Sequence, residues 1–134
     1  MVYKGKILVV DDEVSMRELF ESFFTEAGYE VLPAEGGKEA LVLLQIHDVD
    51  VIFLDLKLFG MNGIELCRQI RKTKPVSMIY AMTGWSALFE IDECREAGFD
   101  DYFEKPLDMD KLLVVVEQAF ERLERWKNRY KTLK

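Results

Sequence analysis

Three consecutive acidic side chains directly follow an apolar run near the start of the chain. In "ILVVDDE" (residues 7–13), Asp11, Asp12 and Glu13 would lie within a few ångströms of one another once the chain folds. Like charges that close repel one another, and a buried charge needs a partner. We therefore expect a positive species beside this acidic run.

Three more polar residues stand where apolar runs end. Asp55 closes the run in "VIFLDLK", Thr83 closes the run in "YAMTGW", and Lys105 follows "YFE" in "YFEKPL". Taken singly, each has an ordinary structural explanation, such as a helix cap for an acid or a hydroxyl and a loop position for the lysine. Their joint placement at the ends of successive apolar runs favours one shared functional site.

The elements that must position these residues alternate along the chain. Five apolar runs of strand length are "KILVV", "YEVLP", "DVIFL", "VSMIYAM" and "DDYF". Each is followed by an amphipathic segment of helix length, at residues 14–27, 38–46, 63–72, 87–97 and from 109 onward. One face of the first segment carries apolar residues at helical spacing: Met16, Leu19, Phe20, Phe23, Phe24 and Ala27. The alternation predicts five β–α units in one compact α/β domain.

The strand-like runs also predict how the sheet is covered. The runs "ILVV" and "VIFL" show no polar alternation, which is typical of strands with helices on both faces. Right-handed crossovers then give a doubly wound parallel sheet, whose functional crevice lies beyond the carboxyl ends of the strands, where strand order reverses. We expect five polar residues to converge there: Asp11, Asp12, Asp55, Thr83 and Lys105.

The expected crevice offers carboxylate oxygens and one fixed ammonium group. Oxygen ligands without nearby His or Cys indicate a hard divalent cation such as Mg²⁺, with Lys105 as a second positive charge. His47 is the only histidine, and Cys67 and Cys94 lack metal-ligand spacing. We therefore expect reduced, buried or half-buried thiols and no zinc site.

Charge is unevenly distributed along the 134 residues. Residues 1–120 hold 12 Lys and Arg against 23 Asp and Glu, whereas residues 121–134 hold 6 against 2. The acidic body disfavours direct nucleic-acid binding, which depends on cations that neutralise phosphates. No apolar run approaches the ~20 residues of a membrane span and the N-terminus lacks a cleavage site, so we expect one cytoplasmic domain without a membrane partner.

Four motifs and the intervals between them resemble the receiver domains of two-component response regulators, in the CheY-like superfamily. They are "VVDDE", "FLDLKLFGMNGIEL", "AMTGW" and "AGFDDYFEKPL", and the similarity runs from residue 5 to about 122. The resemblance implies a flavodoxin-like fold in which five helices surround a five-stranded parallel sheet of order 2-1-3-4-5. It implies a receiver domain at residues 1–122.

The resemblance also implies roles for the acidic residues. Asp55 would accept a phosphoryl group, and Mg²⁺ would be bound by Asp12, Asp55 and the backbone carbonyl of Lys57, with Asp11 acting through water. A carboxylate can attack phosphorus when the charge on the transferred group is neutralised. The donor would be a histidine of a sensor histidine kinase or of a histidine phosphotransfer protein. The chain would then be a phosphorylatable signalling switch without substrate turnover of its own.

Two further positions match the family's switch. Thr83 and Lys105 would contact the phosphoryl oxygens, and Tyr102 matches the aromatic residue that rotates inward after the threonine moves. The resulting change would alter partner binding around the last two helices. The chain has no P-loop, and the glycines of "EGGKEA" follow the second strand, where we expect them to lie away from the crevice. ATP is therefore not the expected direct donor.

Two other interpretations remain. A hydrolase with Asp55 as nucleophile, similar to haloacid dehalogenase-type phosphatases, would carry a second acid where Lys57 stands. A degenerate receiver that only binds partners would have lost an acidic, threonine or lysine position, and none is lost. Phe59 departs from the family, which usually has proline there, so we expect an exposed aromatic residue. Lys57 and Trp85 are placed to obstruct the attacking water, which predicts slow loss of the phosphoryl group.

Apolar residues continue at heptad spacing past the expected end of the domain. This seam consists of Leu112, Val116, Ala119, Leu123, Trp126, Tyr130 and Leu133. It predicts one helix from about Asp110 to at least Tyr130, with residues 123–134 as a helical extension. Residues up to Ala119 should pack on the sheet, whereas Leu123 and the later seam residues have no sheet left to cover. This favours a homodimer through the helix, or a coiled-coil linker to an effector.

Overall fold

The structure is a computed structural model that describes residues 2–84 and 88–133. Strands and helices alternate in the predicted order: β1 (Lys6–Val10), α1 (Val14–Glu26), β2 (Glu30–Ala34), α2 (Gly37–Ile46), β3 (Val51–Asp55), α3 (Gly63–Thr73), β4 (Met78–Thr83), α4 (Leu88–Ala97), β5 (Asp101–Glu104) and α5 (Met109–Leu133). All five predicted β–α units are therefore present, with ends within two residues of those expected.

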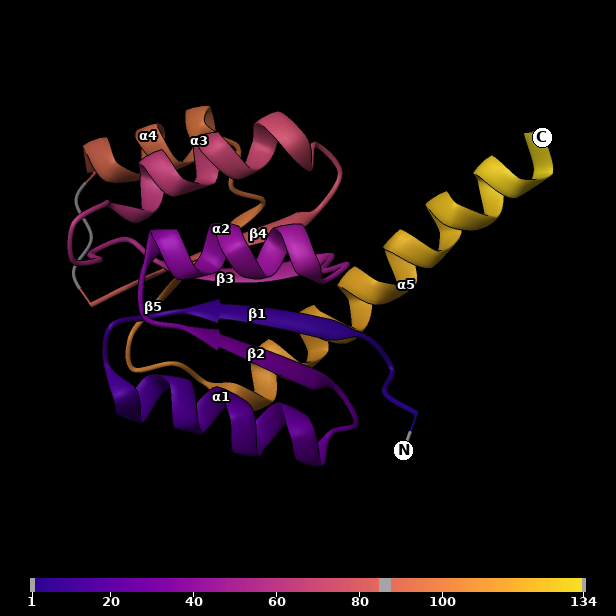
Figure 1. Cartoon of the computed structure of the whole chain (residues 1–134), viewed down its shortest axis with the longest axis horizontal. Coiled ribbons are helices and arrows are strands. Elements are labelled where there is room, and N and C mark those ends of the chain that lie inside the picture. Colours follow the sequence, from indigo (N-terminus) through magenta and orange to yellow (C-terminus); the bar gives the residue numbers. More distant parts are fainter. Residues whose placement is uncertain (1, 85–87, 134) are drawn as a thin grey trace.

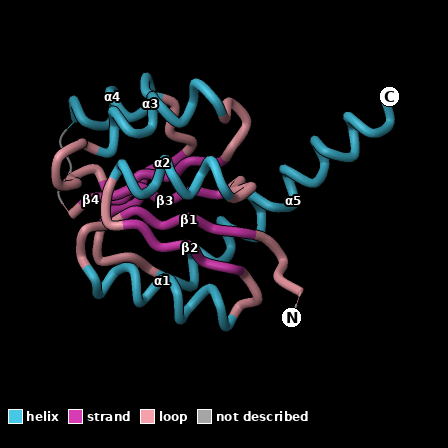
Figure 2. The backbone as a smooth tube through the Cα atoms, viewed as in Figure 1, coloured by secondary structure: helices cyan, strands magenta, loops and turns pink. Residues whose placement is uncertain are grey.

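The strands form one parallel sheet in the order β2-β1-β3-β4-β5. Strand β1 pairs with both β2 and β3, so that Val10 lies beside Ala34 on one side and Leu54 on the other. Strand order therefore reverses at β1 and β3, and the predicted topology is confirmed. Figure 1 shows α1 and α5 on one face of the sheet and α2, α3 and α4 on the other, and Figure 2 shows the strands between these layers.

Alternate residues of the central strands enter two separate cores. Ile7 and Val9 belong to the core beneath α1 and α5, which we call the α1/α5 core. Leu8 and Val10 belong to the core beneath the other three helices. All five residues of β3 are buried. Burial on both faces explains why these strands read as continuous apolar runs, and it holds firmly in place the polar residues at their ends.

One residue of the predicted apolar face of α1 is exposed, whereas the others are buried or half-buried. Phe20 and Phe24 are fully buried, but Leu19 is 39% exposed. At 3.6 residues per turn, Leu19 lies roughly 120° around the helix from the direction midway between these two phenylalanines. The helix is therefore rotated so that Phe20 and Phe24 face the core, whereas Leu19, on the same apolar face, is partly open to solvent.

Helix α5 is continuous over 25 residues and extends beyond the sheet (Figure 1). Its first seam residues are buried as predicted: Leu112, Val116 and Ala119. The expectation for Leu123 was wrong, because it is 5% exposed and belongs to the α1/α5 core. The segment before β1 and the loop before β3 enlarge the body here, and Gly5 and Asp50 line the same hollow as Leu123. Lys127 Nζ then lies 3.0 Å from Asp50 Oδ2 and ties the helix to the body.

Two smaller expectations concern the cysteines and membranes. Cys67 and Cys94 are both free and buried, as predicted. Among the described residues, no helix combines the length and the apolar character that a membrane crossing requires. The division of the chain at residue 122 stays a prediction.

Candidate functional site

Asp11 follows β1 and is fully buried. Its Oδ1 accepts a hydrogen bond from the backbone N–H of Glu13 at 2.9 Å, and its Oδ2 accepts one from Lys105 Nζ at 2.9 Å. Arg17 of α1 donates to the Asp11 carbonyl oxygen at 2.8 Å. Because both carboxylate oxygens have partners, the side chain is fixed and the cost of burying its charge is offset.

Asp55 ends β3 and is buried as well. Its Oδ1 accepts a hydrogen bond from the backbone N–H of Lys57 at 3.1 Å. Helix α3 begins directly against this strand end, since a Cβ atom on Gly63 would collide with the Asp55 carbonyl oxygen and lie 2.9 Å from Leu56 Cα. Instead, the Gly63 N–H donates to the Leu56 carbonyl at 2.9 Å. Gly63 therefore positions the Asp55 loop, a role for which the sequence offered only its place within the longest motif.

Lys105 supplies the positive charge expected beside the acidic run. Its Nζ lies 2.9 Å from Asp11 Oδ2, 3.3 Å from Asp55 Oδ2 and 3.5 Å from Glu13 Oε1. Its backbone N–H donates to the Thr83 carbonyl at 2.7 Å, so the end of β4 helps to place it. One ammonium group thus contacts three carboxylates that come from the ends of β1 and β3.

The charges of this site perturb one another. Burial is the largest effect on the pKa of Asp55 and raises it, and the charge of Asp11 raises it further. The hydrogen bond from the Lys57 backbone N–H and the charge of Lys105 lower it, but the net pKa is raised. For Lys105, burial lowers the pKa, but its hydrogen bond to Asp11 and the charges of Asp11 and Asp55 outweigh burial and raise it. Lys105 therefore stays charged, whereas the Asp55 carboxylate sits where a further cation would stabilise it.

Asp12 completes a cluster of three carboxylates. Asp12 is exposed, unlike Asp11 and Asp55, yet one oxygen from each of the three lies within 4.8 Å of the others, close enough to hold a metal ion. We call these three residues the acidic cluster. Donors that are all oxygen suit a hard divalent cation, so the predicted Mg²⁺ fits this donor set. Both oxygens of Asp11 and both oxygens of Asp55 already accept hydrogen bonds, and Lys105 Nζ donates to each of these two residues.

The two predicted switch residues lie on neighbouring strands, β4 and β5. Thr83, at the end of β4, is 1% exposed. Tyr102, in β5, packs on the core beneath α2, α3 and α4, and its buried hydroxyl has no hydrogen-bond partner in the part of the chain that the structure describes. Lys57 is exposed, and Phe59 is exposed as predicted, whereas Trp85 lies outside the described residues.

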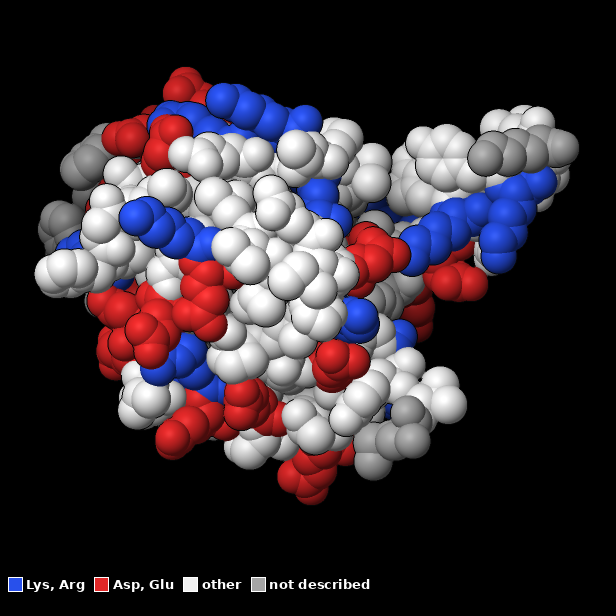
Figure 3. Space-filling model, viewed as in Figure 1, with Lys and Arg blue, Asp and Glu red and all other residues white. Residues whose placement is uncertain are grey.

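The glycine-containing loop after β2 lies nearer to the site than expected. It lines one open hollow of about 700 Å³ together with Asp12 and the loop around Phe59. The expectation that it lies away from the crevice was wrong, because β2 is the neighbour of β1 and their carboxyl ends share one edge. Glu35 and Glu39 also line the hollow, and Figure 3 shows acidic side chains gathered at this end of the molecule. This acidic lining does not suit the phosphates of a nucleotide.

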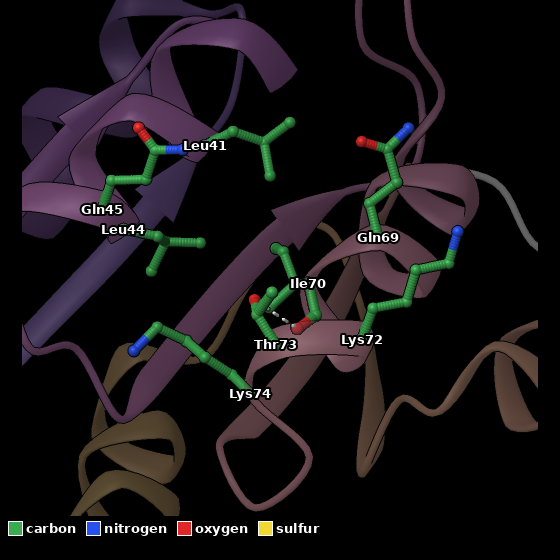
Figure 4. Close-up of a pocket in the computed structure, with 8 residues that line it drawn as sticks. All are labelled: Leu41, Leu44, Gln45, Gln69, Ile70, Lys72, Thr73 and Lys74. Atoms are coloured by element: carbon green, nitrogen blue, oxygen red, sulfur yellow. Dashed lines mark hydrogen bonds between the residues drawn. The ribbon is translucent and has the colours of Figure 1, made fainter.

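A second hollow, of about 610 Å³, lies between α2 and α3. Figure 4 shows Leu41 and Leu44 of α2 on one side and Ile70 of α3 on the other, with Lys72 and Lys74 nearby. Most of the lining comes from the second halves of both helices, so the hollow lies toward the opposite end of the sheet from the acidic cluster. None of the predicted site residues lines it.

The fold and the site define a class: a doubly wound α/β domain whose parallel sheet carries an acidic, lysine-neutralised site at its carboxyl edge. The family model of the response regulator receiver domain matches residues 7–117. The chain is 40% identical over 107 residues to the uncharacterized transcriptional regulatory protein YrkP of Bacillus subtilis, covering 80% of this chain and 46% of that protein. It is 33% identical over 113 residues to the sporulation initiation phosphotransferase F of Bacillus subtilis, covering 84% of this chain and 91% of that protein.

Solved structures agree with these relatives. The CheY-like response regulator receiver domain protein of Methanospirillum hungatei superposes with a TM-score of 0.86 at 27% identity, covering 90% of this chain and 97% of that one. The chain therefore belongs to the receiver domains of two-component response regulators, which are phosphorylatable signalling switches. It spans about half the length of YrkP and most of the length of the sporulation phosphotransferase.

Proposed function

We propose that Asp55 is the phosphoacceptor of this receiver domain. The observation that carries the proposal is the position of its carboxylate, at the end of β3, within the acidic cluster and 3.3 Å from Lys105 Nζ. A carboxylate oxygen of Asp55 forms a bond to phosphorus while the bond from phosphorus to a histidine nitrogen of the partner breaks, and the imidazole leaves with the electron pair. Lys105 is placed to neutralise the transferred group, which is the main catalytic requirement of this chemistry.

Mg²⁺ is the metal that this donor set supports. Asp12 and Asp55 would hold it, together with the backbone carbonyl of Lys57, and Asp11 would act through water. When bound, the ion supplies positive charge beside the phosphoryl oxygens. The chain's own contribution is to hold Asp11 by two hydrogen bonds and to keep Lys105 charged, so that the carboxylates are oriented before a partner arrives.

The switch that follows phosphorylation involves Thr83 and Tyr102. The Thr83 carbonyl accepts a hydrogen bond from the Lys105 backbone N–H, and the Thr83 side chain would contact the phosphoryl oxygens. The Tyr102 hydroxyl is buried without a hydrogen-bond partner among the described residues, an arrangement that costs free energy. Its orientation is therefore sensitive to small changes in its surroundings, and a movement at Thr83 would change the surface around the last two helices.

The partner would be a sensor histidine kinase or a histidine phosphotransfer protein. Among the relatives, a transcriptional regulator and a sporulation phosphotransferase both match across the same domain, which supports a role in either a two-component pair or a phosphorelay. Turnover of an independent substrate is not expected. Self-pairing through α5 and the absence of direct nucleic-acid binding both stay predictions.

Phosphorylation of Asp55→Asn with a small phosphodonor tests the proposal. The wild-type chain, incubated with the donor and Mg²⁺, should gain the mass of one phosphoryl group in an acid-labile form, and chelation of the metal should prevent the gain. Asp55→Asn removes the nucleophile but keeps its size, so no gain is expected. Asp92→Asn, an exposed residue of α4, is the matched control and should be phosphorylated like the wild type. Phosphorylation of the Asp55→Asn chain to the wild-type extent would refute the assignment.

A further inference from the structure

The end of α5 presents an apolar stripe that the body of the protein leaves uncovered. Trp126 is 57% exposed, Tyr130 58% and Leu133 73%, and all three continue the seam whose earlier members are buried. Figure 1 shows this part of the helix projecting from the body. Aromatic residues at such a position are typical of the energetic centres of protein interfaces.

The charges that flank this stripe all have the same sign. If the seam residues occupy the a and d positions of a heptad, with Leu123 and Tyr130 at a and Trp126 at d, the flanking e and g positions are held by Arg122, Lys127 and Arg129. In a coiled coil these positions face the partner helix and decide which partner is accepted. No acidic residue stands at the e and g positions of this stretch.

Three arginines on this helix surround one hollow. Arg122, Arg125 and Arg129 line it together with Trp126, at helical spacing, and its volume is about 360 Å³. Over residues 2–84 and 88–133, none of the three arginines forms an ion pair or a hydrogen bond through its side chain. Figure 3 shows basic side chains along the projecting helix, with a few acidic side chains near its base.

These charges weigh against pairing of the helix with a second copy of itself. In a parallel pair, Arg122 of one helix would face Lys127 of the other, and the contact would be repulsive on both sides of the seam. An antiparallel pair would again bring cations against cations. Lys127 has one partner in Asp50, but its side chain stays 56% exposed. In a self-paired dimer, repulsion between these cations would therefore offset part of the free energy gained by burying the apolar stripe.

We propose that residues 122–133 of α5 bind an acidic amphipathic helix of a partner protein. Leucine-like side chains of the partner would cover Trp126 and Tyr130, and its carboxylates would pair with the arginines, whose planar groups bind carboxylates through two parallel hydrogen bonds. This interface is independent of the chemistry at Asp55.

Two other anionic ligands fit the observations less well. A membrane surface or a nucleic acid would also attract the basic helix, but each is much larger than the stripe and would also approach residues 1–120, whose 23 acidic against 12 basic side chains repel it. A single helix can lie on the projecting stripe alone. The apolar stripe is a seam one residue wide, which suits packing against one helix, whereas helices that lie in a membrane surface have a broad apolar face.

Binding of designed helical peptides tests the proposal. One peptide, about four heptads long, carries Leu at a and d and Glu at e and g; its counterpart carries Lys in place of Glu. We expect the full-length chain to bind the Glu peptide, more weakly as salt increases, and not to bind the Lys peptide. Arg122→Glu with Arg129→Glu, both at g positions, should weaken binding about tenfold or more. Lys72→Glu with Lys74→Glu, at the end of α3, reverses the same charge elsewhere and should leave binding unchanged.

Three results would overturn the proposal. The first is equal binding of both peptides, or equal loss of binding in the two double variants. The second is a dimer in sedimentation equilibrium without peptide that dissociates on Trp126→Ala with Tyr130→Ala, since the helix would then pair with its own copy. The third is binding of duplex DNA or anionic vesicles by a chain that ignores the Glu peptide. The same peptide binding by Asp55→Asn is expected, so a failure here is distinct from a failure of the phosphoacceptor assignment.

Discussion

Replacing Leu123 by alanine tests where the folded body ends. Among the described residues of α5, Leu123 is the last that is buried, whereas Trp126, one turn later on the same stripe, is 57% exposed. Both substitutions remove a large apolar side chain from the seam. We expect Leu123→Ala to destabilise the protein and Trp126→Ala to leave its stability almost unchanged.

The magnitude follows from what Leu123 buries. Removal of three carbon atoms at about 0.8 kcal/mol each gives roughly 2.4 kcal/mol of lost transfer free energy. The space left behind adds to this loss, but Leu123 borders a surface hollow with Gly5 and Phe120, so neighbours and water can fill part of it. We therefore expect Leu123→Ala to lower the free energy of unfolding by about 2–3 kcal/mol. Trp126→Ala should lower it by about 0.5 kcal/mol or less.

Urea denaturation followed by far-ultraviolet circular dichroism measures both values, since this signal does not depend on the tryptophan that one variant lacks. Unchanged slopes with urea concentration would show that the difference lies in stability and not in the compactness of the unfolded chain. A loss for Leu123→Ala no larger than that for Trp126→Ala would refute the reasoning, and the body would then end before Leu123.

Three further predictions concern the site and the core. Gly63→Ala should lower the free energy of unfolding by about 2 kcal/mol and slow phosphorylation of Asp55, because its Cβ would collide with backbone atoms. In Gly36→Ala the nearest atom to the new Cβ would be the Phe59 carbonyl oxygen at 3.9 Å, an ordinary contact, so this variant should be mild in both assays. Burial raises the pKa of Cys67 to about 12, so at pH 8 its reaction with iodoacetamide should be on the order of a thousandfold slower in the folded chain than in urea; equal rates would contradict the burial. Lys57→Ala should speed loss of the phosphoryl group roughly two- to tenfold, measured by mass spectrometry over time, and an unchanged lifetime would remove the shielding role.

The site could be predicted from the sequence because each of its residues follows a strand that is recognisable by itself. Asp11, Asp55 and Lys105 stand at the ends of apolar runs, and in a parallel sheet all such ends meet at one edge. No long-range information beyond the order of the strands was needed. Exposure of Phe59 could also be anticipated, since it stands in the loop between two well-defined elements, where the family usually has proline.

The features that could not be predicted depend on distances between elements. Leu19 fits the period of a buried face, but the rotation of α1 is set by the phenylalanines that fill the core. Leu123 fits a free stripe, but segments from two other parts of the chain reach it. The role of Gly63 follows from the approach of α3 to within collision distance of a strand end, which no periodicity records. Local pattern thus fixes the type of element, while its exact placement depends on the packing of its neighbours.

Because helix α5 is continuous, a movement of its first turn would be carried to its projecting end. The helix begins at Met109, four residues after Lys105. Further along, the burial of Leu123 and the Lys127–Asp50 ion pair attach it to the body. At 1.5 Å per residue, the arm from base to Leu123 is about 21 Å and the arm from Leu123 to the tip about 15 Å. If the helix tilted as a rigid rod about Leu123, a shift of the base would appear at the tip in the opposite direction, at about 0.7 of its size. Salt would weaken the exposed Lys127–Asp50 ion pair and so the attachment of the helix at this point, whereas the buried charges of Asp11 and Asp55 would be screened much less.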